Sequence, residues 1–190
     1  MPDEYRALVD KVTAFTAAAC ERRAADIACT AGCSSCCEVW LTVSPVEAAQ
    51  LRAGLAALSP QARAQLGERG RHEQAREAEG AANARCAMLE PDGRCAVYAH
   101  RPLVCRTQGH ALRYPAGFVP EAAVRARTSS GDVTYCPLNF SGAAPMAEDV
   151  LDAERVDQIL AVVGQRFALA HSHEPGARFA LSALAAESAG

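Results

Sequence analysis

Cys29-Thr-Ala-Gly-Cys33-Ser-Ser-Cys36-Cys37 is the stretch around which this chain is organised, because it gathers four cysteines in an otherwise alanine-rich sequence. Short spacings of the C-x2-C type let a single turn aim two sulfurs at one ion. Thiolates are soft ligands that select zinc, copper(I) or iron–sulfur centres over hard cations. Gly32 allows the tight bend that such a turn needs. We therefore expect the rest of the chain to support a thiolate metal site.

Four more cysteines follow in segments that are predicted to be loops. Each lies beside a turn residue or a break in helical periodicity, where irregular backbone can serve a metal. The predicted ligands are Cys29, Cys33, Cys36, Cys37, Cys86, Cys95, Cys105 and Cys136. The ninth cysteine, Cys20, falls inside a predicted helix, and we expect it to be a small buried apolar residue.

The cysteine count and the net charge limit the classes of protein to which this chain could belong. Nine cysteines are an odd number, and the adjacent Cys36 and Cys37 are poorly placed to bond to each other, so metal fits better than disulfides. The net charge of −3 comes with no basic face, which disfavours nucleic-acid binding. The N-terminus is acidic, and no apolar run approaches the roughly 18 residues that span a bilayer. We expect a cytoplasmic protein that binds neither nucleic acid nor membrane.

The periodicity of the apolar residues predicts a mainly α fold. Residues 3–25 and 149–170 each form an amphipathic pattern, and we expect both to be scaffold helices. In the second of these, the predicted buried stripe is Val156, Ile159, Leu160, Val163 and Phe167. At 190 residues the chain fits one domain, with a loop-rich metal-binding core over residues 29–136 and at most a short β-hairpin.

Two further helix starts lie between the cysteine groups. Ser44-Pro45-Val46-Glu47 combines an N-cap, a proline at the first helical position and a capping-box glutamate, which predicts a helix to about residue 58. Ser59-Pro60 predicts a second, mostly solvated helix to about residue 82, weakened by Gly67 and Gly70. Residues 86–98 read as two short extended pieces around a Pro-Asp-Gly turn, which would bring Cys86 near Cys95.

The combined pattern resembles a known family. The residues that carry the resemblance are Cys29-x3-Cys33-x2-Cys36-Cys37, Arg85-Cys86, Asp92-Gly93-x-Cys95-x-Val-Tyr98-x-x-Arg101-Pro102-x-x-Cys105-Arg106 and a late Cys136. This arrangement is similar to that of the YkgJ-type cysteine-cluster proteins, the CxxCxxCC domain, which is described as chelating zinc or iron. The first gap is three residues instead of two, and Ser34 stands where relatives often have glycine. The resemblance implies metal binding through these cysteines and supplies no reaction.

The identity of the metal stays open at this stage, with an iron–sulfur cluster preferred to zinc. One zinc takes four ligands, so eight thiolates would mean two zinc sites or several spectators, whereas a four-iron cluster takes four cysteines and leaves others to surround it. Arg101 and Arg106 flank Cys105 and would offset thiolate charge, against the alternative that they are ordinary surface arginines, which is as well favoured for Arg106. His110 is a further candidate ligand, against the alternative of a solvated loop histidine.

Two enzymatic readings are less favoured. The C-x3-C-x2-C spacing occurs in radical enzymes that bind a four-iron cluster and S-adenosylmethionine, but here it follows a helix, and strands do not alternate with helices. Flagellin lysine methylases carry a similar cluster in a longer chain, but this sequence has no glycine-rich loop after a strand. No catalytic residue and no partner other than the metal are predicted.

Overall fold

The computed structural model describes residues 2–115, 133–174 and 176–188, and within them the fold is mainly α, as predicted. Its α-helices are α1 (Asp3–Arg22), α2 (Pro45–Ala56), α3 (Pro60–Ala78), α4 (Leu103–Thr107), α5 (Ala153–Ala170) and α6 (Leu181–Glu187). Three 3-10 turns are described, η1 (Ser35–Cys37), η2 (Tyr98–His100) and η4 (Ala147–Asp149). The strands have two residues each: β1 (Thr42–Val43), β2 (Leu112–Arg113), β3 (Val133–Thr134), β4 (Leu151–Asp152) and β5 (Phe179–Ala180).

The chain divides into two compact units. The first unit contains Ala31–Pro102 and Gly164–Gly190, and the second contains Pro2–Thr30 and Leu103–Val163. The boundary at residue 30 passes through the first cysteine group, so Cys29 belongs to the second unit and Cys33 to the first. A single domain over residues 1–190 stays a prediction.

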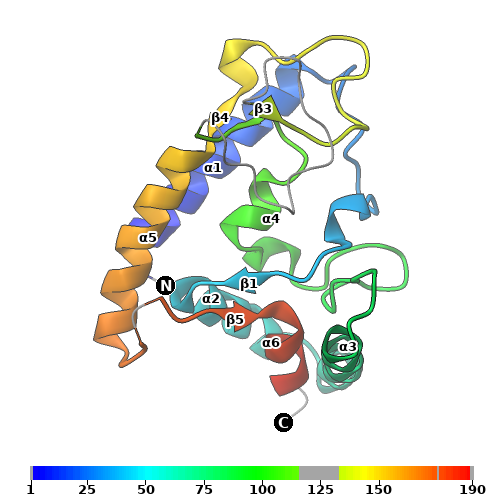
Figure 1. The fold of residues 1–190 in the computed structure, drawn as a ribbon, viewed down its shortest axis with the longest axis vertical. Helices are drawn as coiled ribbons and strands as arrows, with labels where there is room; N and C mark the ends of the chain where they lie inside the picture. Colours follow the sequence, from blue (N-terminus) through cyan, green and yellow to red (C-terminus); the bar gives the residue numbers. More distant parts are fainter. Residues whose placement is uncertain (1, 116–132, 175, 189–190) are drawn as a thin grey trace. The chain divides into compact units, whose positions relative to one another are not determined.

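The first unit is built on α2, α3 and α6. Glu47 accepts hydrogen bonds from the backbone N–H of Ser44 at 3.0 Å and from its hydroxyl at 2.8 Å, which fixes the predicted start of α2. Ser59 accepts from the backbone N–H of Ala62 at 3.2 Å at the start of α3. Strands β1 and β5 pair antiparallel and lead the chain into α6, which lies along α3 (Figure 1). Both predicted helix starts are therefore confirmed.

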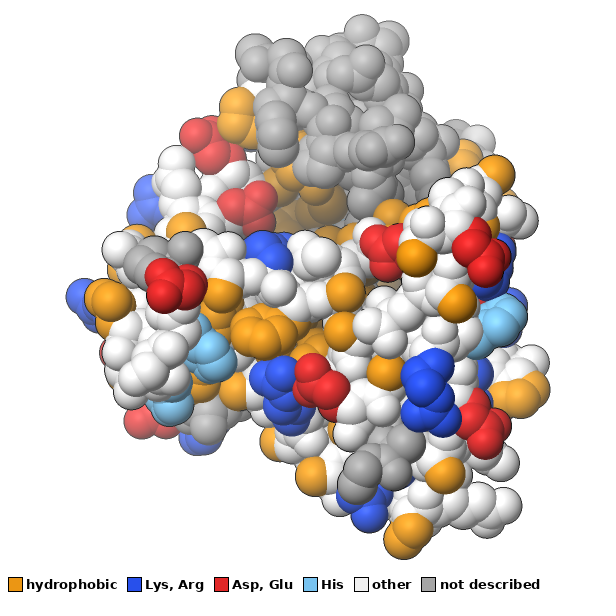
Figure 2. Space-filling view, turned by 60° about the horizontal axis from the view of Figure 1, so that its bottom comes forward, with side chains coloured by type: hydrophobic (Ala, Val, Ile, Leu, Met, Phe, Trp, Pro, Cys, Tyr) orange, Lys and Arg blue, Asp and Glu red, His pale blue; other side chains and the backbone are white. Residues whose placement is uncertain are grey.

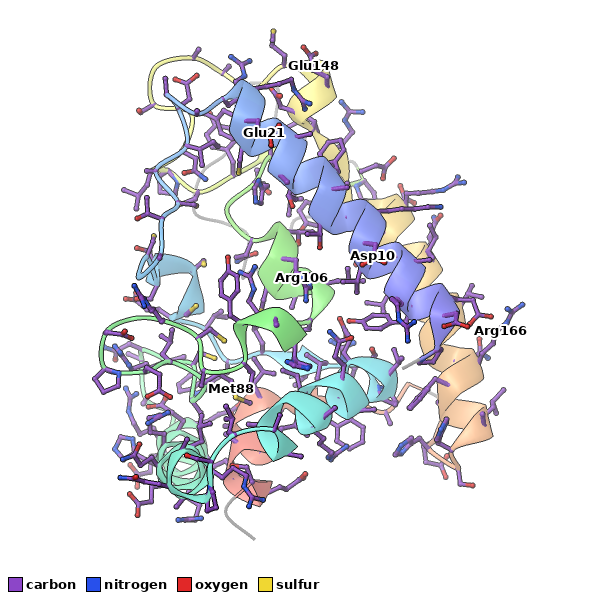
Figure 3. The ribbon with its side chains drawn as sticks, turned by 180° about the vertical axis from the view of Figure 1, so that it is seen from behind. Asp10, Glu21, Met88, Arg106, Glu148 and Arg166 are labelled. Atoms are coloured by element: carbon purple, nitrogen blue, oxygen red, sulfur yellow. The ribbon has the colours of Figure 1, made fainter. Side chains whose placement is uncertain are left out.

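The core of the first unit lies between these helices and the segment that carries Cys86 and Cys95. Its buried residues are Val43, Ala48, Leu51, Leu55, Leu66, Ala87, Met88, Val97, Leu181, Leu184 and Ala185. Met88, labelled in Figure 3, is 2% exposed and comes from the cysteine segment itself. Cys86 and Cys95 are partly buried against this core, so the segment between them packs on it.

Gly70 has a packing role that its sequence position does not reveal. A Cβ at Gly70 would lie 2.4 Å from the backbone nitrogen of Ala186 and 2.6 Å from the carbonyl oxygen of Ser182. The glycine expected to weaken α3 is therefore the point where the backbone of α6 approaches α3 closely.

The second unit contains α1, α4 and a small sheet of order β3-β2-β4. Strand β2 pairs antiparallel with β3 and parallel with β4. The C-terminal end of α1, where Glu21 is labelled, lies near Glu148 in Figure 3. Asp149 joins these segments, because its carboxylate accepts from Arg22 at 3.1 Å and from Arg23 at 2.7 Å. Helix α1 ends at Arg22, three residues before the expected end, and the cysteine stretch follows a helix as predicted.

Helix α5 buries a narrower stripe than the predicted one. Val156 and Val163 are buried, but Ile159 is 39% exposed. Ile159 lies at the outer edge of the stripe, because three residues turn an α-helix by about 300° and so leave it on the flank of the line through Val156 and Val163. The helix begins at Ala153, after η4 and β4.

The surface bears charges of both signs. Figure 2 shows basic and acidic side chains interspersed on the face that it presents. In the described part of the chain, no helix has the length and apolar character needed to cross a bilayer.

Candidate metal centre

Cys86 and Cys95 are brought together by a tight reversal of the chain, as the Pro-Asp-Gly turn predicts. The backbone N–H of Ala96 donates to the carbonyl of Met88 at 2.9 Å, and Leu89 and Cys95 form an isolated antiparallel bridge. At the tip, the backbone N–H of Glu90 donates to the carbonyl of Arg94 at 2.8 Å. The reversal places the two thiols on neighbouring pieces of backbone.

Both thiols sit in an environment that disfavours a free thiolate. Burial raises the pKa of Cys86 to about 11, helped by the neighbouring thiols of Cys95 and Cys36 and opposed by a hydrogen bond from the Met88 backbone. Burial likewise raises the pKa of Cys95, against a hydrogen bond from the Val97 backbone and the charge of Arg101. A bound cation would reverse this preference, because thiolates are stabilised by coordination.

The sulfurs of Cys86 and Cys95 share one local arrangement. Each is hydrogen-bonded by a backbone group two residues farther along the chain, from Met88 and Val97 respectively. Donors of this kind orient thiolate ligands and tune the metal that they hold. The turn around each cysteine therefore directs a backbone N–H at its sulfur.

The first cysteine group reaches the same region through Cys36 and Cys37 in η1. The backbone N–H of Cys86 donates to the carbonyl of Cys37 at 2.9 Å, and the Cys36 thiol is near enough to raise the pKa of Cys86. Cys36, Cys86 and Cys95 thus belong to one neighbourhood in the first unit.

A contact between two glycines joins the segment that carries Cys33 to the turn that precedes Cys95. Gly32, with φ +93°, lies against the turn at Asp92 and Gly93, and a Cβ at Gly93 would stand 2.6 Å from the carbonyl oxygen of Gly32. Both glycines also have positive φ, a conformation that glycine adopts without strain. Glycine therefore suits these two positions both in its backbone conformation and in the space available. The exposed Cys33 follows Gly32 directly and is carried toward the turn that precedes Cys95.

Helix α3 fixes the base of the cysteine reversal with two charged side chains. Arg69 donates to the carbonyl of Ala87 at 3.1 Å and to Glu90 at 2.9 Å. Glu73, 5% exposed, accepts from the backbone N–H of Arg85 at 3.1 Å and from Arg76 at 2.8 Å. Burial would raise the pKa of Glu73, but its hydrogen bonds with Arg76 and Arg85 outweigh burial and lower it.

Three predicted ligands lie in the second unit. Cys29 and Cys136 both lie next to Gly109, where an added Cβ would stand 3.4 Å from Cys29 Sγ and 3.7 Å from Cys136 Cβ. Asn139 donates from Nδ2 to Cys29 Sγ at 3.3 Å. Cys136 is buried, Cys29 is exposed, and Cys105 is half-buried on α4.

The thiols of the described residues do not surround a common point at metal-binding distance. Among the residues that the structure describes, no three His, Cys, Asp or Glu side chains are close enough to hold a metal ion. The donors nevertheless fit a soft metal, since they are thiols with hydrogen-bond donors directed at three of the sulfurs. Cys20 is only half-buried on α1, and burial raises its pKa.

Sequence reasoning missed Asn139 and Glu73, which hydrogen-bond to Cys29 and to the residue before Cys86. Glu73 lies in a charged helical segment that is predicted to be solvated, and Asn139 lies in a loop. The one local signal for Asn139 is its place three residues after Cys136, whose carbonyl accepts the Asn139 backbone N–H at 2.9 Å. Periodicity could not predict that Asn139 contacts Cys29 or that Glu73 contacts the Arg85 backbone.

The chain matches the model of a protein family. The model of the CxxCxxCC family, described as a "putative zinc- or iron-chelating domain", matches residues 28–132, which is more than half of the chain. The matched residues include seven of the eight predicted ligands and exclude Cys136. Neither the curated proteins nor the solved structures contained a significant match.

Proposed function

The chain belongs to the CxxCxxCC family, and we propose that it binds a metal centre through its clustered cysteine thiolates. The observation that carries the proposal is the shared neighbourhood of Cys36, Cys86 and Cys95 in the first unit. We propose Cys33, which follows the Gly32–Gly93 contact, as the fourth thiolate of a set in this unit. We propose Cys29, Cys37, Cys105 and Cys136 as the remaining ligands.

We propose an iron–sulfur cluster as the bound species, with a redox role. Five of the predicted ligands lie in the first unit, so a four-iron cluster would use four of them and leave the fifth thiol beside it as a redox or hydrogen-bonding group. The guanidinium of Arg101 is near enough to lower the pKa of Cys95, and it lies 3.6 Å from the Tyr98 ring centroid. A cation held there would offset the charge of a thiolate-bound cluster. When bound, the cluster would supply one-electron chemistry.

Zinc is the second candidate, and one observation favours it. The thiols of the first unit come from two short turns, Cys33-x2-Cys36 and the reversal between Cys86 and Cys95. Two turns that contribute two thiolates each are the usual construction of a four-cysteine zinc site, which stabilises a fold without redox chemistry.

Elemental analysis and visible absorption of protein purified without oxygen test the proposal. We expect iron and sulfide, with visible absorbance that falls on reduction. Colourless protein with stoichiometric zinc would replace the cluster by the second candidate. Absence of both metals would overturn metal binding.

Paired variants test the ligand assignment. Cys86→Ser should lose the metal, whereas Cys20→Ser, at the half-buried cysteine on α1, should retain it. Equal metal content in these two variants would contradict the assignment. Since metal-binding free energy is folding free energy in such sites, Cys86→Ser should also lower the melting temperature of the loaded protein.

A further inference from the structure

The side chain of Asn139 is 1% exposed and uses its amide fully. Its Oδ1 accepts the backbone N–H of Ala28 at 2.9 Å, and its Nδ2 donates to the carbonyl of Gly109 at 2.7 Å and to Cys29 Sγ at 3.3 Å. The Ala28 N–H can only donate and the Gly109 carbonyl can only accept, so these two partners fix which end of the amide faces which way. The NH2 group is therefore the end directed at the sulfur.

The backbone around this amide holds two distant segments together. Phe140 donates its backbone N–H to the carbonyl of Asp26 at 2.6 Å, and Cys136 donates to the carbonyl of Gly109 at 3.3 Å. Asn139 and Cys29 are 110 residues apart in sequence. Gly109 lies beside this sulfur, since a Cβ there would stand 3.4 Å from Cys29 Sγ, which is an ordinary van der Waals contact.

The Asn139 amide can donate to the Cys29 sulfur whether or not that sulfur carries a proton. A Cys29 thiol can donate to Asn139 Oδ1, but at 3.6 Å, whereas the Nδ2–H donates to the sulfur at 3.3 Å. A metal-bound thiolate has no proton and can only accept. N–H donors to thiolate sulfur orient the ligand and tune the metal's affinity and potential.

We propose that Asn139 is a positioning residue that orients Cys29 as a metal ligand. This role rests on the metal binding proposed above and goes beyond it, because Asn139 itself touches no metal. It acts through the Cys29 sulfur, so its effect must vanish when that sulfur is removed.

A double-mutant cycle with Co²⁺ as the probe tests this role. Metal-free protein is titrated with Co²⁺ under anaerobic conditions, and affinity is measured by competition with a chromophoric chelator. We expect Asn139→Ala to weaken Co²⁺ binding about tenfold and to shift the thiolate-to-cobalt charge-transfer band. In a Cys29→Ser background, adding Asn139→Ala should cause no further loss.

Two controls separate positioning from loss of the fold. Asn139→Asp keeps an oxygen for the Ala28 N–H while removing the Nδ2 donations to the Gly109 carbonyl and to the sulfur, so it should weaken binding, and an unchanged helical circular-dichroism signal would show that the fold is kept. It carries the test if Asn139→Ala does not fold. Asn83→Ala, at an exposed asparagine of the first unit, should leave Co²⁺ affinity unchanged.

Three outcomes would overturn the role of Asn139. Equal losses from Asn139→Ala in both backgrounds would assign it a structural effect only. If Cys29→Ser binds Co²⁺ with the affinity of the wild type, Cys29 is not a ligand, but the proposed metal binding still stands. Wild-type protein that does not bind Co²⁺ through thiolates would remove the proposed function and the role of Asn139 together.

Discussion

Gly93 lies so close to Gly32 that a Cβ on Gly93 would stand 2.6 Å from the Gly32 carbonyl oxygen. Gly32 precedes Cys33, and Gly93 precedes Cys95 by two residues, so the contact sets the approach of two thiol-bearing turns within the first unit. Glycine is required at this approach because any side chain would need the space that the carbonyl occupies.

Gly93→Ala should therefore weaken both the fold and the metal site. Its φ of +81° adds strain for an alanine, so we expect a loss of about 1–3 kcal/mol in the free energy of unfolding. Metal content after anaerobic reconstitution should fall, because Cys33 is pushed away from Cys95. Denaturant unfolding of the metal-free protein and elemental analysis of the loaded protein measure the two effects.

Gly80→Ala is the matched control for this substitution. Gly80 has a similar φ of +71°, but no heavy atom lies within 4 Å of the position that a Cβ would take there. It should show the backbone strain alone and keep its metal. Equal metal loss in the two variants would contradict a role for the Gly32–Gly93 contact.

Asp149 should make the free energy of unfolding fall at acid pH. Burial would raise the pKa of its carboxyl, but hydrogen bonds from Arg23, the Met146 backbone and Arg22 outweigh burial and hold the pKa below its ordinary value of 3.8. A carboxyl whose pKa is lowered by folding adds stability above its unfolded pKa and loses it as pH falls through the folded value. Stability should therefore fall progressively below pH 3.8.

Asp149→Asn should cost about 1–3 kcal/mol at neutral pH, because hydrogen bonds to a charged group are lost. The variant should also show a shallower loss of stability in acid, measured by denaturant unfolding across pH. Asp3→Asn is the control, since the Asp3 side chain is 94% exposed in its pair with Arg6 and should matter little. An unchanged acid slope in Asp149→Asn would refute the assignment.

Gly70→Ala should destabilise the protein although alanine favours helices. The added Cβ would meet backbone atoms of Ala186 and Ser182 at 2.4 and 2.6 Å, so α6 must shift. Overpacking of this kind costs about 1–3 kcal/mol, against a gain of about 1 kcal/mol from helix propensity. Thermal unfolding should therefore show a lower melting temperature.

Gly164→Ala, in α5, should do the opposite. Its nearest contacts to an added Cβ are with Ser44, at 3.7 and 3.9 Å, which is ordinary van der Waals distance. We expect it to gain about 0.5–1 kcal/mol from helix propensity alone. A gain at Gly70 as well would mean that α6 does not limit the space there.

Glu73→Gln should loosen the start of the cysteine reversal. The buried carboxylate accepts from the Arg85 backbone, next to Cys86, and from Arg76. We expect a cost of about 1–3 kcal/mol and weaker metal retention in a chelator challenge. Glu77→Gln, at an exposed position of the same helix, should change neither quantity. Comparable metal loss in both variants would contradict an anchoring role for Glu73.

Much of the fold follows from local sequence. The helix starts at Ser44 and Ser59 are found where capping chemistry predicts them, because an N-cap and its proline act within one turn. The reversal between Cys86 and Cys95 likewise follows from its turn residues. The predicted stripe of α5 is too wide, since periodicity gives a direction but not the width of the covering surface.

Cysteine spacing and helix signals are local properties, so they are enough to predict the thiol-rich segments, the mainly α fold and the family. The three-dimensional structure is needed to assign Cys29 and Cys33, which are four residues apart, to different units. The same holds for three contacts: Asn139 donates to Cys29, Glu73 accepts from the Arg85 backbone, and α6 packs closely against Gly70. The physical reason is that such partners lie far from each other along the chain or on different elements, and packing rather than local propensity brings them together.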